Sequence, residues 1–121
     1  MRNIPKYFRV EPSDDTLILS AMSSINMILD QEVREECDLL VEQLSHHSAT
    51  NLVIDLGAVN HFGSVMLELM VILWKHLKSG TGKFVVCNVS TIGKQVLHAT
   101  KLETLWTILP SREESLTFMR S

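Results

Sequence analysis

The chain has 121 residues, a net charge of −3 and a hydrophobic fraction of 45%, which are the size and composition of one globular domain spanning residues 1–121. The small negative charge argues against binding to nucleic acid or to an anionic membrane. No run reaches the ~18 apolar residues that a membrane span needs, and the N-terminus lacks the apolar run of a signal peptide. We therefore expect a cytoplasmic protein whose two cysteines are small buried hydrophobic residues.

The N-terminal part of the chain predicts a hairpin followed by a helix. Residues 7–10 and 16–19 are short strand-like runs, and residues 11–15 between them have the composition of a turn. In residues 30–44, apolar side chains recur at helical spacing. The charged side chains expected on the solvated face of this helix are Glu32, Arg34, Glu35, Glu36, Asp38 and Glu42.

The middle of the chain predicts a strand, a loop and a second helix. Residues 52–56 are a nearly unbroken apolar run, which is typical of a strand buried on both faces. Residues 57–63 are small or polar and form a connection. The helix should begin at Ser64 or Val65, and a serine in this place can accept a hydrogen bond from an unpaired N–H group of the first turn.

The C-terminal part predicts two more strands, each followed by a helix. The strands are expected at residues 83–89 and 105–109, and a short helix should run from Ser90 or Thr91 to about His98. Ser111 opens the last helix, because Glu114 three residues later completes a capping box. The side chains expected to face the core from these two helices are Ile92, Leu97, Leu116 and Met119 or Phe118.

The resulting order is β-β-α-β-α-β-α-β-α. Strands that are separated by helices favour right-handed crossovers and parallel pairing, whereas the N-terminal hairpin adds an antiparallel pair. We therefore predict an α/β domain with a mixed four- or five-stranded sheet and helices mainly on one face.

The stretch from Val53 to Leu67 resembles the STAS family, the domain of bacterial anti-sigma-factor antagonists. In that family a strand leads into a loop that carries Asp-Ser-Ser-Gly or Asp-Thr-Ser-Gly, and a helix follows. Here Val53-Ile54-Asp55-Leu56 aligns with the strand and Phe62-Gly63-Ser64-Val65-Met66-Leu67 with the motif. Ser64 falls at the position of the phosphorylatable residue, whereas Gly63 replaces the aspartate, Val65 the second small polar residue and Met66 the glycine. The order of elements over nearly the whole chain is also that of a STAS domain.

The resemblance implies a bacterial regulator of transcription that acts by partner switching. Its partner would be an anti-sigma factor with serine kinase activity, which the unphosphorylated antagonist captures and from which phosphorylation at Ser64 releases it. A weak homodimer is compatible with this role. The alternative is a STAS subunit that is not phosphorylated and serves in an assembly, as in stressosomes or lipid-transport complexes; the departures at Gly63 and Met66 favour it.

Signals of catalysis and of metal binding are weak. The glycines fit neither a Walker nor a Rossmann phosphate loop, and there is no Gly-x-Ser-x-Gly motif. Asp55 is expected to accept backbone N–H groups of the following loop rather than to act as a base. His61 and Ser64 lack a third catalytic partner, and the adjacent His46 and His47 do not usually point at one ion. We expect no catalytic residue, no cofactor and no metal ion.

The outer face of the helix after Ser64 is more apolar than solubility requires. On a helical wheel, Glu68, Lys75 and Ser79 mark the outward line, with Val65, Val71 and Ile72 beside it, whereas Leu67, Met70, Trp74 and Leu77 point inward. Exposed apolar groups of this kind mark interaction surfaces, unless another element or a second copy of the chain covers them. The candidate partner-binding residues are His61, Phe62, Gly63, Val65, Glu68 and Ile72.

Overall fold

The computed structural model describes residues 4–22, 30–60, 62–78 and 82–121. Its strands are β1 (Phe8–Ser13), β2 (Thr16–Ala21), β3 (Asn51–Asp55), β4 (Phe84–Cys87) and β5 (Thr107–Leu109). Its helices are α1 (Asp30–His46), α2 (Ser64–Lys78), α3 (Thr91–Ala99) and α4 (Arg112–Arg120), and a short 3₁₀ helix, η1 (Leu102–Thr104), follows α3. The predicted order of strands and helices is confirmed.

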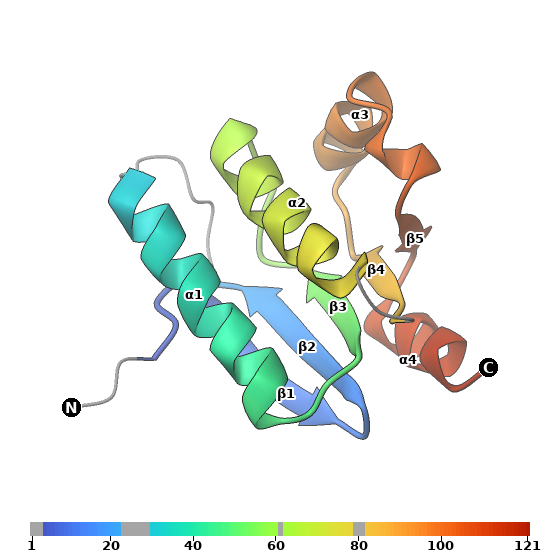
Figure 1. Ribbon diagram of the computed structural model, residues 1–121. Helices are drawn as coiled ribbons and strands as arrows, with labels where there is room; N and C mark the ends of the chain where they lie inside the picture. Colours follow the sequence, from blue (N-terminus) through green and yellow to red (C-terminus); the bar gives the residue numbers. More distant parts are fainter. Residues whose placement is uncertain (1–3, 23–29, 61, 79–81) are drawn as a thin grey trace.

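The strands form one mixed sheet in the order β1-β2-β3-β4-β5 (Figure 1). β1 and β2 pair in antiparallel fashion, whereas β2, β3, β4 and β5 are all parallel to their neighbours. β3 is central, and all its residues except the last are buried, as the apolar run in the sequence predicts. The carboxyl ends of the parallel strands therefore meet along one edge of the sheet.

The two faces of the sheet are covered unequally. The larger core lies between one face, with residues such as Leu52 and Ile54, and buried side chains of α1, α2 and α3. A smaller core on the other face joins Val53 and Val85 to Met119 of α4. Figure 1 shows α1 and α2 lying side by side across the sheet, so the prediction of helices mainly on one face is confirmed.

The buried face of α2 is turned about the helix axis relative to the face that the helical wheel predicts. Its fully buried side chains are Met66, Leu69, Met70 and Leu73, with Leu77 nearly so. Leu67 and Trp74, which were expected to point inward, are only half-buried. The reason is that α2 packs against α1 and also shares the larger core with the sheet, so its buried stripe faces both neighbours.

Three local expectations from the sequence are wrong. The first turn is tighter than residues 11–15, since β1 extends to Ser13 and Asp14 takes a left-handed conformation with φ 54°, which aspartate tolerates. Ile92 on α3 is 54% exposed rather than buried. The last strand is only Thr107–Leu109, because residues 102–104 form η1 and the buried Trp106 packs against Phe84.

Glu36 is a further exception, because it is buried and not on the solvated face of α1. Its carboxylate accepts the backbone N–H groups of Lys6 (2.8 Å) and Tyr7 (2.9 Å), and the Tyr7 hydroxyl donates to Glu32 at 2.9 Å. These bonds attach the segment before β1 to α1. A buried carboxylate is tolerated where donors satisfy it in this way.

We predict that Glu36→Ala destabilises the protein by about 1–3 kcal/mol, because two backbone N–H groups lose a charged acceptor. The matched control is Glu35→Ala on the exposed side of the same helix, which should stay within about 0.5 kcal/mol of wild type. Urea unfolding of the three proteins measures both values. Equal losses in the two variants would contradict the assigned role of Glu36.

Candidate functional site

Ser64 lies at the start of α2, just beyond the carboxyl edge of the sheet, and its side chain is exposed. The Gly63 carbonyl accepts the N–H of Leu67 at 3.2 Å, so Gly63 occupies the N-cap position and Ser64 is the first helical residue. The expectation that Ser64 itself caps the helix is therefore wrong by one position. The first turn of α2 contains no acidic residue, so no carboxylate there neutralises the positive end of the helix dipole.

The loop that leads to Ser64, residues 56–63, is fixed by several hydrogen bonds. The N–H of Leu56 donates to the Cys87 carbonyl at 3.1 Å, and the N–H of Val59 donates to the Leu56 carbonyl at 3.0 Å. Further along, the Ser90 hydroxyl donates to the Asn60 carbonyl. The loop is thus bonded both to itself and to the connection between β4 and α3.

Phe62 fixes the far end of the same loop. Its side chain is 4% exposed, and it lies so close to Gly93 of α3 that a Cβ atom there would come within 2.8 Å of the Phe62 ring. This close approach explains a glycine inside a helix, which otherwise disfavours helix formation. Ser90 caps α3 by accepting the N–H of Gly93 at 3.0 Å, so the start of α3 forms one wall of the loop.

The near end of the loop is fixed by Asp55, the last residue of β3. Its Oδ1 atom accepts the N–H of Gly57 at 2.9 Å and the Asn88 side-chain amide at 3.0 Å. Its Oδ2 atom accepts Nε and Nη2 of Arg112 at 3.3 and 3.2 Å. The expectation that Asp55 accepts a backbone N–H of the loop is confirmed, whereas the ion pair with Arg112 was not foreseen.

Arg112, at the start of α4, also contacts the two N-terminal strands. Its Nη1 atom donates to both carboxylate oxygens of Glu11 (3.3 and 3.1 Å), and its Nη2 atom donates to the Ser20 hydroxyl (2.7 Å). Although partial burial lowers the pKa of Arg112, the charges of Glu11 and Asp55 raise it above its ordinary value, and the guanidinium stays protonated. In the sequence Arg112 is visible only as a residue within a capping box, and its partners lie up to 101 positions away.

A cavity of about 380 Å³ adjoins this group of charged residues. Its lining includes Arg9, Ser20, Asp55, Asn88 and Arg112. The donors and acceptors described above already satisfy one another, which is the pattern of a structural network rather than of an open catalytic site.

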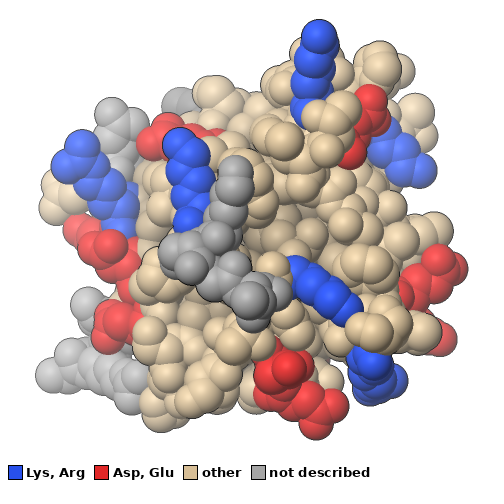
Figure 2. All heavy atoms as spheres, turned by 45° about the vertical axis from the view of Figure 1, so that its right-hand side comes forward, with Lys and Arg blue, Asp and Glu red and all other residues tan. Residues whose placement is uncertain are grey.

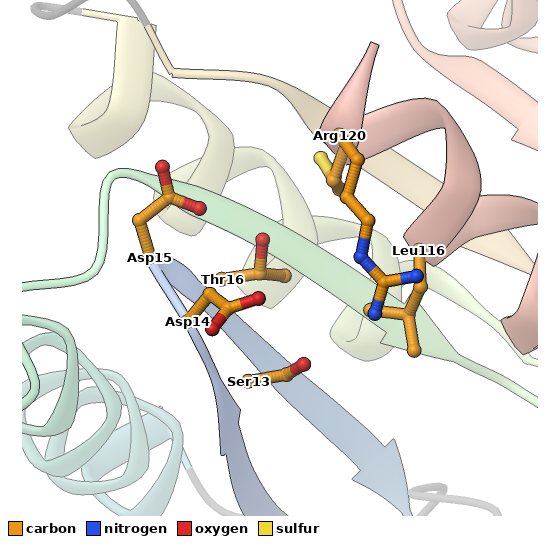
Figure 3. A pocket seen from close by; sticks show the side chains of 7 residues that line it. Ser13, Asp14, Asp15, Thr16, Leu116 and Arg120 are labelled. Atoms are coloured by element: carbon orange, nitrogen blue, oxygen red, sulfur yellow. The ribbon is translucent and has the colours of Figure 1, made fainter.

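A second hollow, of about 480 Å³, lies at the opposite end of the sheet. Figure 3 shows Asp14 and Asp15 of the hairpin turn on one side of it and Arg120 of α4 on the other. Asp15 Oδ1 accepts the side-chain amide of Asn51 at 3.3 Å. Within the described ranges, no three His, Cys, Asp or Glu side chains gather as they would around a metal ion.

The predicted partner-binding residues fall into three groups. Gly63 and Glu68 are exposed, and Val65 is half-buried. Ile72 is 39% exposed and shares a helix face with Val65 and Glu68, since the three are spaced by three, four and seven residues. Phe62 supports the loop from inside instead of presenting its ring to solvent, and His61 lies outside the described residues.

On the face that lies to the right in Figure 1, basic and acidic side chains are interspersed with uncharged surface (Figure 2). A shallow hollow of about 230 Å³ between the end of α2, β5 and α4 is lined largely by apolar side chains, among them Trp74, Phe84, Leu105 and Phe118. Leu105 is 57% exposed. The sequence pattern did not single out this region.

Both cysteines are buried, as expected. Burial raises the pKa of Cys37 and that of Cys87 to about 11, so both thiols are protonated at neutral pH and lack the nucleophilic thiolate. None of the described helices is long and apolar enough to cross a bilayer.

Several solved structures are similar to this chain over nearly its whole length. A protein from Thermotoga maritima, proposed as an anti-sigma factor antagonist, has a TM-score of 0.83 at 19% identity and covers 94% of this chain and 95% of its own. An anti-sigma factor antagonist from Mycobacterium paratuberculosis gives 0.77 at 27% identity, with 94% and 93% covered. An anti-sigma-factor antagonist (STAS) domain protein from Planctomyces limnophilus gives 0.75 at 26% identity, with 94% and 98% covered.

A comparison with curated protein sequences gave no match. The sequence model of the STAS domain, however, matches residues 7–115. The matched region contains every strand of the sheet, helices α1, α2 and α3, and the start of α4. The chain therefore belongs to the STAS domain family.

Proposed function

We propose that this protein is an anti-sigma-factor antagonist that works by partner switching, with Ser64 as the phosphorylated residue. The observation that carries the proposal is an exposed serine at the first position of α2, at the end of a loop whose other contacts are buried or bonded. The similarity to solved antagonists at 27% and 26% identity supports the general role. The phosphorylation and the identity of the kinase are our inference.

The position of Ser64 suits a phosphate without unfolding the domain. A phosphoserine carries about −1.5 to −2 charges, and the N–H groups and dipole at a helix N-terminus attract such a charge. The first turn of α2 contains no acid that would repel the phosphate, and the exposed Glu68 one turn further on would oppose it only weakly. The modification would therefore leave the fold intact and change the charge of the surface that a partner meets.

The surface beside Ser64 supplies the apolar contacts for binding. Val65 and Ile72 lie along one side of α2 with Glu68 between them. A phosphate at the end of this row would have to be desolvated in the complex, which is costly unless a counter-charge meets it. Phosphorylation would thus weaken the complex and dephosphorylation would restore it.

The partner we propose is an anti-sigma factor with serine kinase activity. The partner would supply ATP and the catalytic groups, whereas this chain would supply the hydroxyl that receives the phosphate. Capture of the anti-sigma factor by the unphosphorylated protein would release a sigma factor. No step of this scheme needs a catalytic residue, cofactor or metal ion in the STAS domain itself.

A specific observation keeps the assembly role as a second candidate. Gly63 stands where the family has an aspartate, yet a Cβ atom at Gly63 would meet nothing within 4 Å. Lack of room for a side chain therefore does not explain why residue 63 is not an aspartate. A function that does not require phosphorylation would explain it. An assembly subunit should elute as a large complex, and a partner-switching antagonist as a monomer or weak dimer.

Our first functional prediction concerns Ser64→Ala and Ser64→Asp. Because Gly63 holds the N-cap position, Ser64→Ala should change the free energy of unfolding by less than about 0.5 kcal/mol and should keep partner binding. Ser64→Asp should remain folded, with an acid at the helix start, but should bind the anti-sigma factor at least tenfold more weakly. Calorimetric titration and thermal unfolding measure these effects.

The control is Thr117→Asp, which adds the same charge at an exposed position on α4, on the opposite face of the sheet. It should bind the anti-sigma factor as wild type does. If Ser64→Ala and Ser64→Asp bind equally well and the cognate kinase with ATP leaves no phosphate on Ser64, the switch is wrong and the assembly role takes its place.

A second prediction concerns Ile72. Ile72→Asp should weaken partner binding by well over tenfold, since a carboxylate would be desolvated in an apolar contact. Because Ile72 is 39% exposed, the melting temperature should shift by only a few degrees. Leu105→Asp, at a more exposed site away from the start of α2, should leave both binding and melting unchanged. A large loss of stability in Ile72→Asp would instead place Ile72 in the core.

A further inference from the structure

We propose that Arg112 is a positioning residue, through which α4 holds the Ser64 loop in its binding-competent shape from the opposite face of the sheet. The inference rests on the proposed function, since it concerns the same loop. The contact between Arg112 and Asp55 lies outside the motif around Ser64. The contact comes from a residue 57 positions away in the sequence from its carboxylate partner.

The guanidinium of Arg112 is held in one orientation by its hydrogen bonds. Its three nitrogen atoms reach acceptors on three strands: Glu11 of β1, Ser20 of β2 and Asp55 of β3, at distances between 2.7 and 3.3 Å. A planar group with this many fixed partners has little freedom to turn. Arg112 therefore presents Nε and Nη2 to Asp55 in one orientation.

The carboxylate of Asp55 is bonded through both of its oxygen atoms. One oxygen faces Arg112, and the other receives the N–H of Gly57 and the Asn88 amide. Because both oxygens belong to one rigid group, the contact with Arg112 sets the direction in which the other oxygen meets Gly57. The Asp55 side chain is only 12% exposed, so solvent does not readily replace Arg112.

The position of Gly57 affects the rest of the loop up to Ser64. Gly57 is the second residue after β3, and the bonds at Val59 and Asn60 lie directly beyond it. A rotation at Gly57 would move these residues relative to Phe62, which is fixed against Gly93. The positions of Gly63 and Ser64 thus depend on how both ends of the loop are fixed. Arg112 fixes the end nearer to β3 through Asp55.

The packing of α4 does not by itself require this contact. Met119 anchors α4 in the smaller core, with Leu116 and Phe118 beside it, and Ser111 caps the helix by accepting the N–H of Glu114 at 3.1 Å. The Lys83 ammonium donates to the carbonyls of Phe118 and Ser121 at the other end. The loss of Arg112 should therefore release the loop without detaching the helix.

The test compares Arg112→Gln, Arg112→Lys and the control Arg120→Gln, which removes the same charge from an exposed site on α4. Amide exchange by NMR should show the Gly57 N–H exchanging at least tenfold faster in Arg112→Gln, relative to the Val85 and Val86 amides of β4, which report global opening. Arg112→Lys should give an intermediate rate, since one ammonium cannot reach all three acceptors. Arg120→Gln should match wild type.

Asn88→Gly is a second variant that keeps the proposal testable if Arg112→Gln folds poorly. Asn88 has a left-handed φ of 55°, which glycine adopts freely, so the change removes the amide donor with little strain. The ion pair between Asp55 and Arg112 is retained in this variant. The Gly57 amide should then exchange less than threefold faster than in wild type, and a rise of tenfold or more in this variant would overturn the special role of Arg112.

The functional readout is phosphorylation of Ser64 by a kinase that modifies the wild-type protein. Arg112→Gln should lower kcat/KM at least fivefold and Arg120→Gln should not. An unchanged Gly57 exchange rate, or a faster rate with unchanged phosphorylation, would each overturn the positioning role. If no kinase modifies Ser64 in the wild type, the proposed switch fails, whereas the exchange experiment still decides whether Arg112 holds the loop.

Discussion

The carboxylate of Asp55 is the constraint on which the functional end of this domain depends. It stands where the buried central strand β3 leaves the sheet, so it is the first polar group that the chain offers after a run of buried apolar residues. Its partners come from three segments: Gly57 of the loop, Asn88 after β4 and Arg112 of α4. A polar group at this depth is stable only if these bonds are made together.

Because of this constraint, the loop before Ser64 has fixed ends, whereas the residues at the start of α2 are exposed. Gly57 and Phe62 are fixed at the two ends of the loop, whereas Gly63 and Ser64 project beyond the edge of the sheet. A residue that is to be read by a partner and modified by a kinase has to be accessible, and it also has to be held in one place. The arrangement satisfies both needs, because the hydrogen bonds lie beneath the loop and the hydroxyl lies at its surface.

Local sequence patterns predicted the parts of the fold that depend on local periodicity. The apolar run 52–56 and the helix that begins at Ser64 were correct, because burial on both faces and helical spacing are visible within a few residues. Glu36 and Arg112 were missed for the opposite reason: each finds its partners at least 29 positions away, and no local pattern records such a pair. Ile92 was misplaced because α3 is short and buries only a narrow stripe.

The proposed switch can be tested directly by the phosphorylation state of Ser64 in the native cell. Intact mass with site mapping, on protein isolated under conditions that preserve phosphate, measures it without any assumption about the partner. If the protein is a partner-switching antagonist, a fraction of it carries one phosphate, located at Ser64, and this fraction changes with growth conditions. Protein that carries no phosphate on Ser64 under any condition, while it still binds its partner, would contradict the phosphorylation switch.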